Sequence, residues 1–286
     1  MDRTKKPPER TESEQLTIIQ PSRGWSWINL GELWRYRELI YFLVWRDVKV
    51  RYKQTLLGAA WAILKPFLSM VIFTLIFSGL ANLETDGAPA PVFYYAGLLP
   101  WVLFQDGVTK AGNSLVTGRS LITKVYFPRI AIPLASVLAG LVDFALSFLV
   151  LIGMMIYFGI RPTDAVWTLP LFLLLAMVTA LGVGLWLSAL NVQYRDVAYV
   201  TPFLLQAWMY ASPVVYSATL IPEGWARIVY GLNPMAGVVQ GFRWAILGVG
   251  EPPSGLIILS VLMAFLLLVS GMLYFKRMER TFADVV

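Results

Sequence analysis

The chain has 286 residues, of which 58% are hydrophobic and only 14% are charged, and its formal net charge is +6. Soluble domains contain about 45–50% apolar residues, so this chain has too few polar residues to cover a soluble fold, and we predict an integral membrane protein. It contains no cysteine and no histidine, which excludes disulfides, thiolate or imidazole metal sites, and catalysis by a Ser-His pair.

Residues 1–29 are polar and charged, so we expect a largely disordered cytosolic tail. Residues 30–54 predict an amphipathic helix, because at about 100° per residue its charged and apolar side chains fall on opposite faces. The charged arc contains Arg35, Glu38, Arg46, Lys49 and Lys53, and the apolar arc contains Leu33, Ile40, Val44 and Val48. With Trp34, Tyr41 and Trp45, this pattern is typical of a helix in the membrane interface. A soluble amphipathic helix is the alternative, but an apolar segment follows at once.

Six apolar segments are long enough to cross a bilayer, which takes about 20 residues. They are residues 59–81, 91–110, 132–158, 167–190, 200–217 and 255–275. Backbone in lipid must satisfy its own hydrogen bonds, and the alternating pattern of a β-barrel is absent, so these segments are predicted helices. We therefore expect an all-α integral membrane protein, with a six-helix transmembrane domain over residues 55–280 and a short cytosolic tail over residues 281–286.

Charges in the loops predict the orientation of the chain. Basic residues after the second, fourth and sixth segments are Arg119, Lys124, Arg129, Arg195, Lys276, Arg277 and Arg280. The other loops mix Arg161, Arg227 and Arg243 with acidic residues. Because cytosolic loops are enriched in lysine and arginine, both termini are predicted to lie in the cytosol. The positive charge is then explained by anionic lipid or a cytosolic partner, without nucleic acid.

Residues 221–247, between the fifth and sixth segments, are too apolar for a free loop. They predict two short helices, residues 223–230 and 234–247, separated at Gly231–Pro234. Each is too short to cross the bilayer, which favours an extracytoplasmic re-entrant hairpin. Such a hairpin is well placed to gate a pathway, and a surface-lying hairpin without a gating role is the alternative.

Charged side chains inside the apolar segments are the default pointers to function in a membrane protein. They are Lys65, Asp106, Lys110 and Asp143. Asp106 and Lys110 are four residues apart and can pair on one helix. Asp143 lies about 18 Å into its segment at 1.5 Å per residue. It is either a proton or ion site or a buried group that holds helices together, and we favour the second because proton relays use several such groups.

Aromatic residues are concentrated in the second and fifth segments: Tyr94, Tyr95, Trp101, Phe104, Trp208, Tyr210 and Tyr216. They are interpreted either as interfacial belts or as a channel wall along which sugar rings slide. Gly182 and Gly184 predict close helix packing. The chain has no GxxxxGK[ST] phosphate loop, zinc spacing or nucleophile elbow, so an energy-providing nucleotide site would lie on another chain.

Five motifs resemble one known family. They are ELWRYRELIYFLVWRDVKVRYKQTLLGAAWAILKP, GLLPWVLFQDGVTKAGNSLV, LITKVYFPRIAIPLASVLAGLVDF, LNVQYRDVAYVTPFLLQAWMYASPVVYS and IPEGWARIVYGLNPM. In this order, over about residues 30–280, they resemble the membrane subunit of bacterial ATP-binding-cassette polysaccharide exporters, the O-antigen, capsule and teichoic-acid permeases.

The resemblance implies a non-enzymatic subunit of the bacterial cytoplasmic membrane. Two copies would pair with two cytosolic ATPase subunits, which bind ATP and Mg²⁺, and export a lipid-linked glycan. It implies ATPase-coupling roles for Arg46, Asp47, Arg51, Arg119, Lys124, Tyr126 and Arg129, and lesser contacts for Arg195 and Asp196. It also implies an exit gate at the hairpin that carries Trp225, Tyr230, Asn233 and Pro234. Residues 46–53 would then act as a lever, with a corner at Leu56–Gly58 that transmits movement into the first span.

Three alternatives remain open from the sequence. An ion-coupled secondary transporter would use Asp143, but such proteins commonly contain inverted repeats, and the two halves show no similarity. A membrane-embedded glycosyltransferase would need a carboxylate cluster in a loop, which is not visible. A small-molecule exporter of the same superfamily is compatible with the motifs, because a fold does not specify a substrate.

Overall fold

The computed structural model describes residues 30–53, 58–122, 127–250, 252, 255–279 and 282. The predicted N-terminal tail, residues 1–29, lies outside them. The described residues form helices and connecting turns without a strand, as predicted. Four helical stretches are long and apolar enough to cross a membrane: Ala60–Leu80, Ala131–Tyr157, Asp164–Gln193 and Leu256–Met278. They correspond to the first, third, fourth and sixth predicted spans.

These four stretches have the following bounds. The first is α3 (Gly58–Phe73), which continues into the π-helical segment η1 (Thr74–Leu80). The second is α6 (Ala131–Tyr157). The third is the 3-10 turn η2 (Asp164–Thr168) followed by α7 (Leu169–Gln193), and the fourth is α11 (Leu256–Met278).

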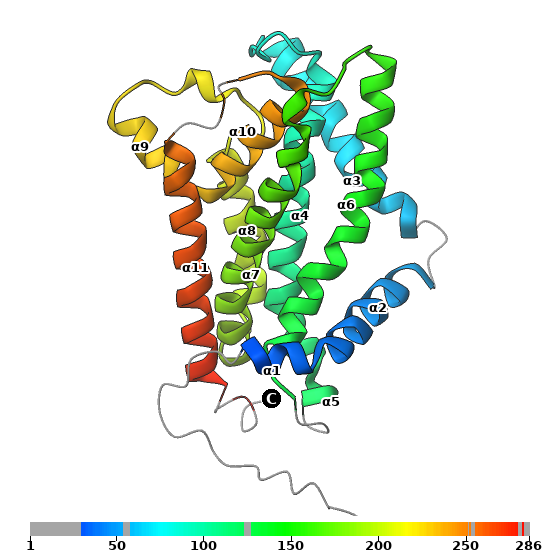
Figure 1. The fold of residues 1–286 in the computed structure, drawn as a ribbon, viewed down its shortest axis with the longest axis vertical. Helices are drawn as coiled ribbons and strands as arrows, with labels where there is room; N and C mark the ends of the chain where they lie inside the picture. Colours follow the sequence, from blue (N-terminus) through cyan, green and yellow to red (C-terminus); the bar gives the residue numbers. More distant parts are fainter. Residues whose placement is uncertain are drawn as a thin grey trace, which may run out of the picture.

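The helix α4 (Ala90–Thr117) lies at the centre of the bundle. It contacts α3, α6, α7, α8 and α10 (Figure 1). Its 28 residues extend beyond the predicted segment 91–110 at the end that carries Asp106 and Lys110. Since neighbours surround it, most of its residues are buried.

The predicted fifth span, residues 200–217, is wrong in its extent. The helix α8 (Val197–Tyr210) has 14 residues, which is about 21 Å against a hydrocarbon core of about 30 Å. Residues 211–217 turn instead, with a bond of 2.7 Å from the Val214 amide to the Ser212 carbonyl. Pro213 has no amide hydrogen to continue the helix, and the short 3-10 helix η3 (Ala218–Leu220) follows.

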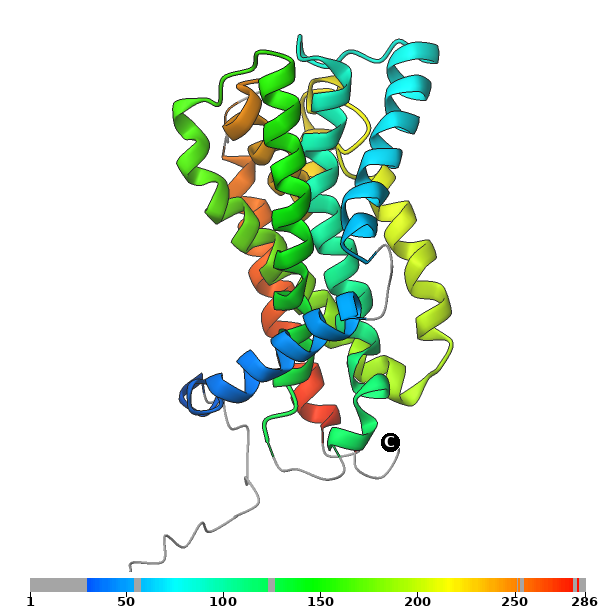
Figure 2. The ribbon, with the colours of Figure 1, turned by 90° about the vertical axis from the view of Figure 1, so that its right-hand side faces the viewer.

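The predicted N-terminal amphipathic helix is present as α1 (Leu30–Arg35) and α2 (Arg37–Lys53), interrupted at Tyr36. The five residues of the predicted charged arc are exposed and the four of the apolar arc are partly buried. Leu43 is buried in a small core with Phe127, Ile132 and Phe275. Figure 2 shows α2 running obliquely across α6.

The two short helices predicted between the fifth and sixth segments are present as α9 (Trp225–Gly231) and α10 (Pro234–Leu247), with bounds close to those predicted, and we call the pair the hairpin. Most of α10 is buried against α4, α7 and α11. The hairpin lies at one end of the bundle, whereas α1, α2, the short α5 (Arg119–Ile122) and the end of α11 lie at the other (Figure 1). The described chain therefore begins and ends at the same end of the bundle.

Close helix contact at Gly182 and Gly184 is confirmed. A Cβ atom at Gly182 would lie 2.7 Å from the backbone of Leu267 and Leu268 in α11. A Cβ atom at Gly184 would lie 2.6 Å from the Cβ of Ala111 in α4. Because these distances are shorter than van der Waals contact, α7 can approach both neighbours only with glycine at these positions.

Candidate functional site

Five charged residues from four helices meet in what we call the charge cluster: Arg51 of α2, Lys65 of α3, Asp106 and Lys110 of α4, and Asp143 of α6. The Lys65 Nζ lies 2.8 Å from Asp106 Oδ1, and the Lys110 Nζ lies 3.5 Å from Asp106 Oδ2. The Lys110 Nζ is also 3.3 Å from Asp143 Oδ2, and Arg51 pairs with the same carboxylate. The ion pairs thus connect α2 and α3 to the central bundle.

Asp143 accepts hydrogen bonds from three donors. They are Arg51, Lys110 and the hydroxyl of Tyr52. Burial and the bond to Asp143 raise the pKa of Tyr52 to about 12, so Tyr52 remains a protonated donor at neutral pH. Since these donors come from α2 and α4, Asp143 has the contacts expected of a group that bridges helices.

A cavity of about 380 Å³ lies beside the charge cluster. All five cluster residues line it, together with apolar side chains such as Trp61, Leu103 and Phe144. Trp61 is 56% exposed, whereas Leu103 is buried. Nearby, the Ser147 hydroxyl donates to the Ala62 carbonyl over 2.8 Å and joins α6 to α3. The cavity is therefore lined by both charged and apolar side chains.

The residues predicted to contact an ATPase fall into different environments. Arg46, Arg119, Arg195 and Asp196 are exposed, at the end of the bundle that carries α2 and α5 (Figure 1). Asp47 is partly buried and bonds to Arg46 at 2.8 Å and to the Ser136 hydroxyl at 3.5 Å. These contacts leave Arg46 accessible while Asp47 also attaches α2 to α6.

Arg129 contacts other residues of the same chain. Its Nη1 donates to the Glu279 carbonyl over 2.6 Å, and its guanidinium lies 6.0 Å from the centre of the Phe282 ring. Arg129 therefore connects the loop before α6 to the end of α11. Lys124 and Tyr126, also predicted to contact an ATPase, lie outside the described residues.

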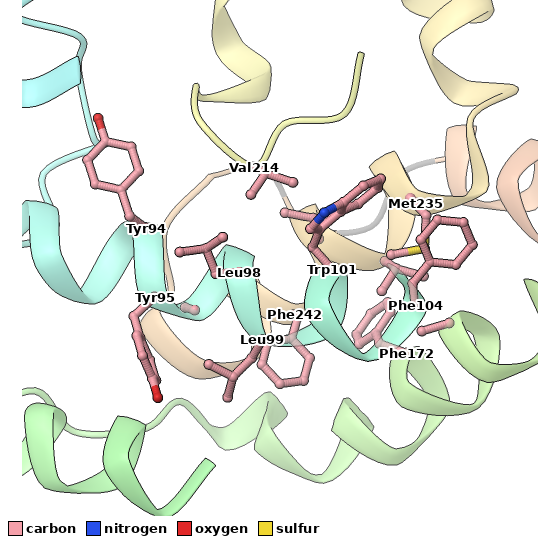
Figure 3. Packing of buried hydrophobic residues seen from close by; sticks show 14 of the residues in the cluster. Tyr94, Tyr95, Leu98, Leu99, Trp101, Phe104, Phe172, Val214, Met235 and Phe242 are labelled. Carbon is pink, nitrogen blue, oxygen red and sulfur yellow. The ribbon is translucent and has the colours of Figure 1, made fainter. Parts of the chain in front are cut away.

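The predicted channel wall is wrong for four aromatic residues. Tyr94, Tyr95, Trp101 and Phe104 have no exposed surface, and Figure 3 shows them packed among buried side chains of other helices. The centres of the Trp101 and Phe104 rings are 5.2 Å apart. They are core residues because α4 is surrounded by helices, and a residue with no exposed surface cannot face a channel between subunits.

The aromatic residues of α8 lie closer to the surface. Trp208 is partly buried and Tyr210 is 50% exposed. Tyr216, in the turn after α8, is also partly buried. The exposed face of α8 also contains Tyr199 and Phe203, which the sequence analysis did not include. The period of α8 places residues 199, 203, 206 and 210 on one face, and this period was the signal available for finding them.

The predicted gate residues differ in environment. Asn233 connects the hairpin to the end of α8: its Oδ1 accepts from Trp208 Nε1 at 2.9 Å, and its Nδ2 donates to the Ser212 hydroxyl at 2.9 Å. The same Oδ1 accepts from the Met235 amide and caps α10, whose first residue, Pro234, is buried. Trp225 is exposed, and the Tyr230 hydroxyl is buried and has no hydrogen-bond partner among the described residues.

Arg243 of α10 is a buried cation that the sequence analysis assigned only to an outer loop. It is 4% exposed and donates to the carbonyls of Phe93, Pro213, Val214 and Tyr216, at 3.0, 2.5, 2.6 and 3.2 Å. Its guanidinium also lies 3.6 Å from the centre of the Phe93 ring. An arginine within the apolar run GFRWAIL was the signal available in the sequence. Arg243 joins the hairpin to α4 and to the turn after α8.

Among the described residues, no group of three or more acidic, histidine or cysteine side chains could hold a metal ion.

The class of protein follows from comparison with known families. The model of the family described as ABC-2 type transporter matches residues 38–247. These residues extend from α2 to the end of α10. The chain belongs to the ABC-2 type transporter membrane family.

Relatives of this chain include permeases for surface polysaccharides. It is 32% identical over 213 residues to the O-antigen export system permease protein RfbA of Myxococcus xanthus, covering 74% of this chain and 81% of that protein. It is 27% identical over 259 residues to an RfbA of Klebsiella pneumoniae, covering 90% and 97% of the two chains. It is also 24% identical over 208 residues to the polysialic acid transport protein KpsM of Escherichia coli, covering 71% and 78%.

Proposed function

We propose that this chain is the permease subunit of an ATP-driven exporter that moves a lipid-linked polysaccharide across the bacterial cytoplasmic membrane. The observation that carries the proposal is similarity to O-antigen export permeases along nearly the whole chain, including 97% of the Klebsiella protein. Similarity to a polysialic acid transport protein supports the same substrate class. Family membership and the paired state of Asp143 favour this function over an ion-coupled transporter.

The proposed topology has six passes with both termini in the cytosol. The passes are α3 with η1, α4, α6, η2 with α7, α8 with the turn that follows it, and α11. An even number of passes is supported because the described chain begins and ends at the same end of the bundle. The hairpin α9–α10 would re-enter the membrane from the outside, where Arg243 satisfies backbone carbonyls without water.

The absence of cysteine makes this topology directly testable. Single cysteines at Arg161 and Trp225, both exposed, should react with a membrane-impermeant maleimide in intact cells. Cysteines at Lys53 and Arg195, also exposed, should react only after the membrane is permeabilised. The unmodified chain is the control for background labelling. Labelling of Arg195→Cys in intact cells would contradict the orientation.

Two copies of this chain with two ATPase subunits are the proposed assembly. Exposed Arg46, Arg119, Arg195 and Asp196 at the predicted cytosolic end support an ATPase contact there. The sequence has no phosphate loop, so ATP and Mg²⁺ belong to the partner and the permease itself performs no hydrolysis. Exposed aromatic residues of α8, including Tyr199, Phe203 and Tyr210, are the better candidates for contact with sugar rings.

The export proposal is tested by complementation of a strain that lacks its own exporter. The chain is expressed alone, with its ATPase, and with an ATPase whose phosphate-loop lysine is replaced, and surface glycan is measured. We expect glycan at the surface only with the active ATPase. Glycan restored by this chain alone, or equally by the inactive ATPase, would refute an ATP-driven permease.

A further inference from the structure

We propose that the cavity beside the charge cluster is a binding site for a lipid phosphate group, with the phosphate among the cluster side chains and the start of the lipid chain against the apolar side chains that also line the cavity. The inference rests on the proposed function, because it gives the lipid-linked substrate a place of entry on the protein. Two sources share this chemistry: a prenyl-type phosphate or diphosphate anchor and a membrane phospholipid.

The charge of the cluster fits an anion. Arg51, Lys65 and Lys110 carry three positive charges against the two carboxylates of Asp106 and Asp143, so the cluster has a net charge of +1. Phosphate oxygens accept strong charge-assisted hydrogen bonds from lysine and arginine. In a partly desolvated cavity, an uncompensated positive charge attracts an anion more strongly than it would in water.

The cations remain reachable from the cavity. The Lys65 side chain is 50% exposed and the Lys110 side chain 32% exposed, although both are paired with carboxylates. A phosphate can therefore approach these ammonium groups without unfolding a helix. Arg51 is less exposed, at 23%, and contacts the same oxygen of Asp143 as Lys110.

The apolar part of the cavity lining fits an apolar chain. Trp61, Leu103 and Phe144 belong to it, and Trp61 is more than half exposed. At about 380 Å³, the cavity is within the range of about 300–1,000 Å³ that is usual for ligand sites. A soluble anion would make no use of these apolar side chains, so the combination of charged and apolar lining favours an amphiphile with a phosphate at one end.

The two carboxylates also suit a transporter. Asp106 already pairs with Lys65 and Lys110, and it competes with any phosphate for the same donors. Binding is therefore weaker than three unpaired cations would provide, and a transported group must be able to leave as well as enter. A site of net +1 charge is attractive enough to recruit the phosphate and weak enough to release it.

Equilibrium binding to the purified full chain in phosphatidylcholine nanodiscs tests the proposal, with farnesyl diphosphate as the probe. Lys65→Gln should weaken binding about tenfold, because it removes one charge-assisted contact, and Lys65→Arg should retain it. Asp106→Asn should tighten binding severalfold, because it removes a competing anion. Arg277→Gln is a control on an exposed arginine of α11, far along the chain from the cavity, and should leave binding unchanged.

Opposite changes in binding affinity for Lys65→Gln and Asp106→Asn would distinguish a binding site from a purely structural ion pair. If Asp106→Asn weakened binding as much as Lys65→Gln, or if neither changed it, the proposal would be overturned. Competition by inorganic diphosphate as strong as that by farnesyl diphosphate would overturn the apolar part of the site. Competition by phosphatidylglycerol but not by farnesol would support a lipid phosphate site and assign it to membrane phospholipid.

This measurement is independent of export. It uses the chain without an ATPase, so failure to bind farnesyl diphosphate would remove the proposed site while the complementation result stands. Conversely, the chain could bind farnesyl diphosphate with the affinity changes predicted for Lys65→Gln and Asp106→Asn and still fail complementation. That result would retain the site and remove the export function.

Discussion

Replacing Arg243 with methionine should destabilise the end of the bundle that carries the hairpin. The guanidinium serves four backbone carbonyls in two separate segments: Phe93 in α4, and Pro213, Val214 and Tyr216 in the turn after α8. Methionine retains part of the apolar stem but donates no hydrogen bond. The carbonyls would then remain buried without a donor.

The size of the effect follows from these contacts. A buried polar group left without a partner costs about 1–3 kcal/mol. A neighbouring cavity of about 20 Å³, lined by Asp86, Ser217 and Gln240, has room for about one water molecule, so some acceptors can be satisfied again. We therefore expect a loss of about 3–5 kcal/mol in the free energy of unfolding, comparable to removal of one partner of a buried pair.

Thermal unfolding of the purified protein, followed by tryptophan fluorescence, measures this loss. At about 2–4 °C per kcal/mol, Arg243→Met should lower the Tm by about 10 °C. The Tm of Arg243→Lys should lie between those of the unmodified protein and Arg243→Met, because one ammonium group cannot reach all four carbonyls. Arg161→Gln, at an exposed position, is the matched control. A Tm for Arg243→Met within about 2 °C of the control would show that these carbonyls do not depend on the guanidinium.

Three further predictions concern the packing and the predicted lever. Gly182→Leu should separate α7 from α11 and lower the Tm, whereas Gly153→Leu, where a Cβ meets nothing within 4 Å, should not; equal Tm values would contradict close packing. Asp143→Asn should increase proteolysis within α2, because it weakens the contacts of Arg51 and Tyr52 with residue 143, worth about 1–3 kcal/mol, while export stays ATPase-dependent; unchanged proteolysis would show that these contacts do not hold α2. Gly58→Leu should reduce the amount of glycan exported per ATP hydrolysed, and an unchanged ratio would refute the lever.

Helix positions that depend on local sequence patterns could be predicted. The turn sequence Gly231–Pro234 separates the hairpin helices because proline starts a helix readily and asparagine caps it. The charged and apolar arcs of α1 and α2 follow from helical periodicity alone. Long apolar runs similarly gave the bounds of α6 and α11 to within a few residues.

Features that depend on three-dimensional contacts were not predictable in the same way. Residues 211–217 remain apolar after α8 ends, so hydropathy did not reveal the turn whose carbonyls Arg243 binds. Tyr94 and Trp101 lie in an apolar segment, but composition does not distinguish a core side chain from a lining one. That difference depends on how many neighbours surround α4, which only the arrangement of the helices determines.

The contacts of Arg243 have a consequence for biosynthesis. Each of its four acceptors precedes it in the chain, and a ribosome delivers segments from the N-terminus onward at about 5–20 residues per second. A nascent chain therefore exposes the carbonyls of residues 213, 214 and 216 in the membrane before their donor has been synthesised. α10, with 14 residues, is too short to insert as a spanning helix, so the end of the bundle that carries the hairpin is completed late, when α10 docks. Ribosomes stalled before and after α10 should thus carry an open and a closed form of the same bundle, distinguishable by the protease sensitivity of residues 211–217.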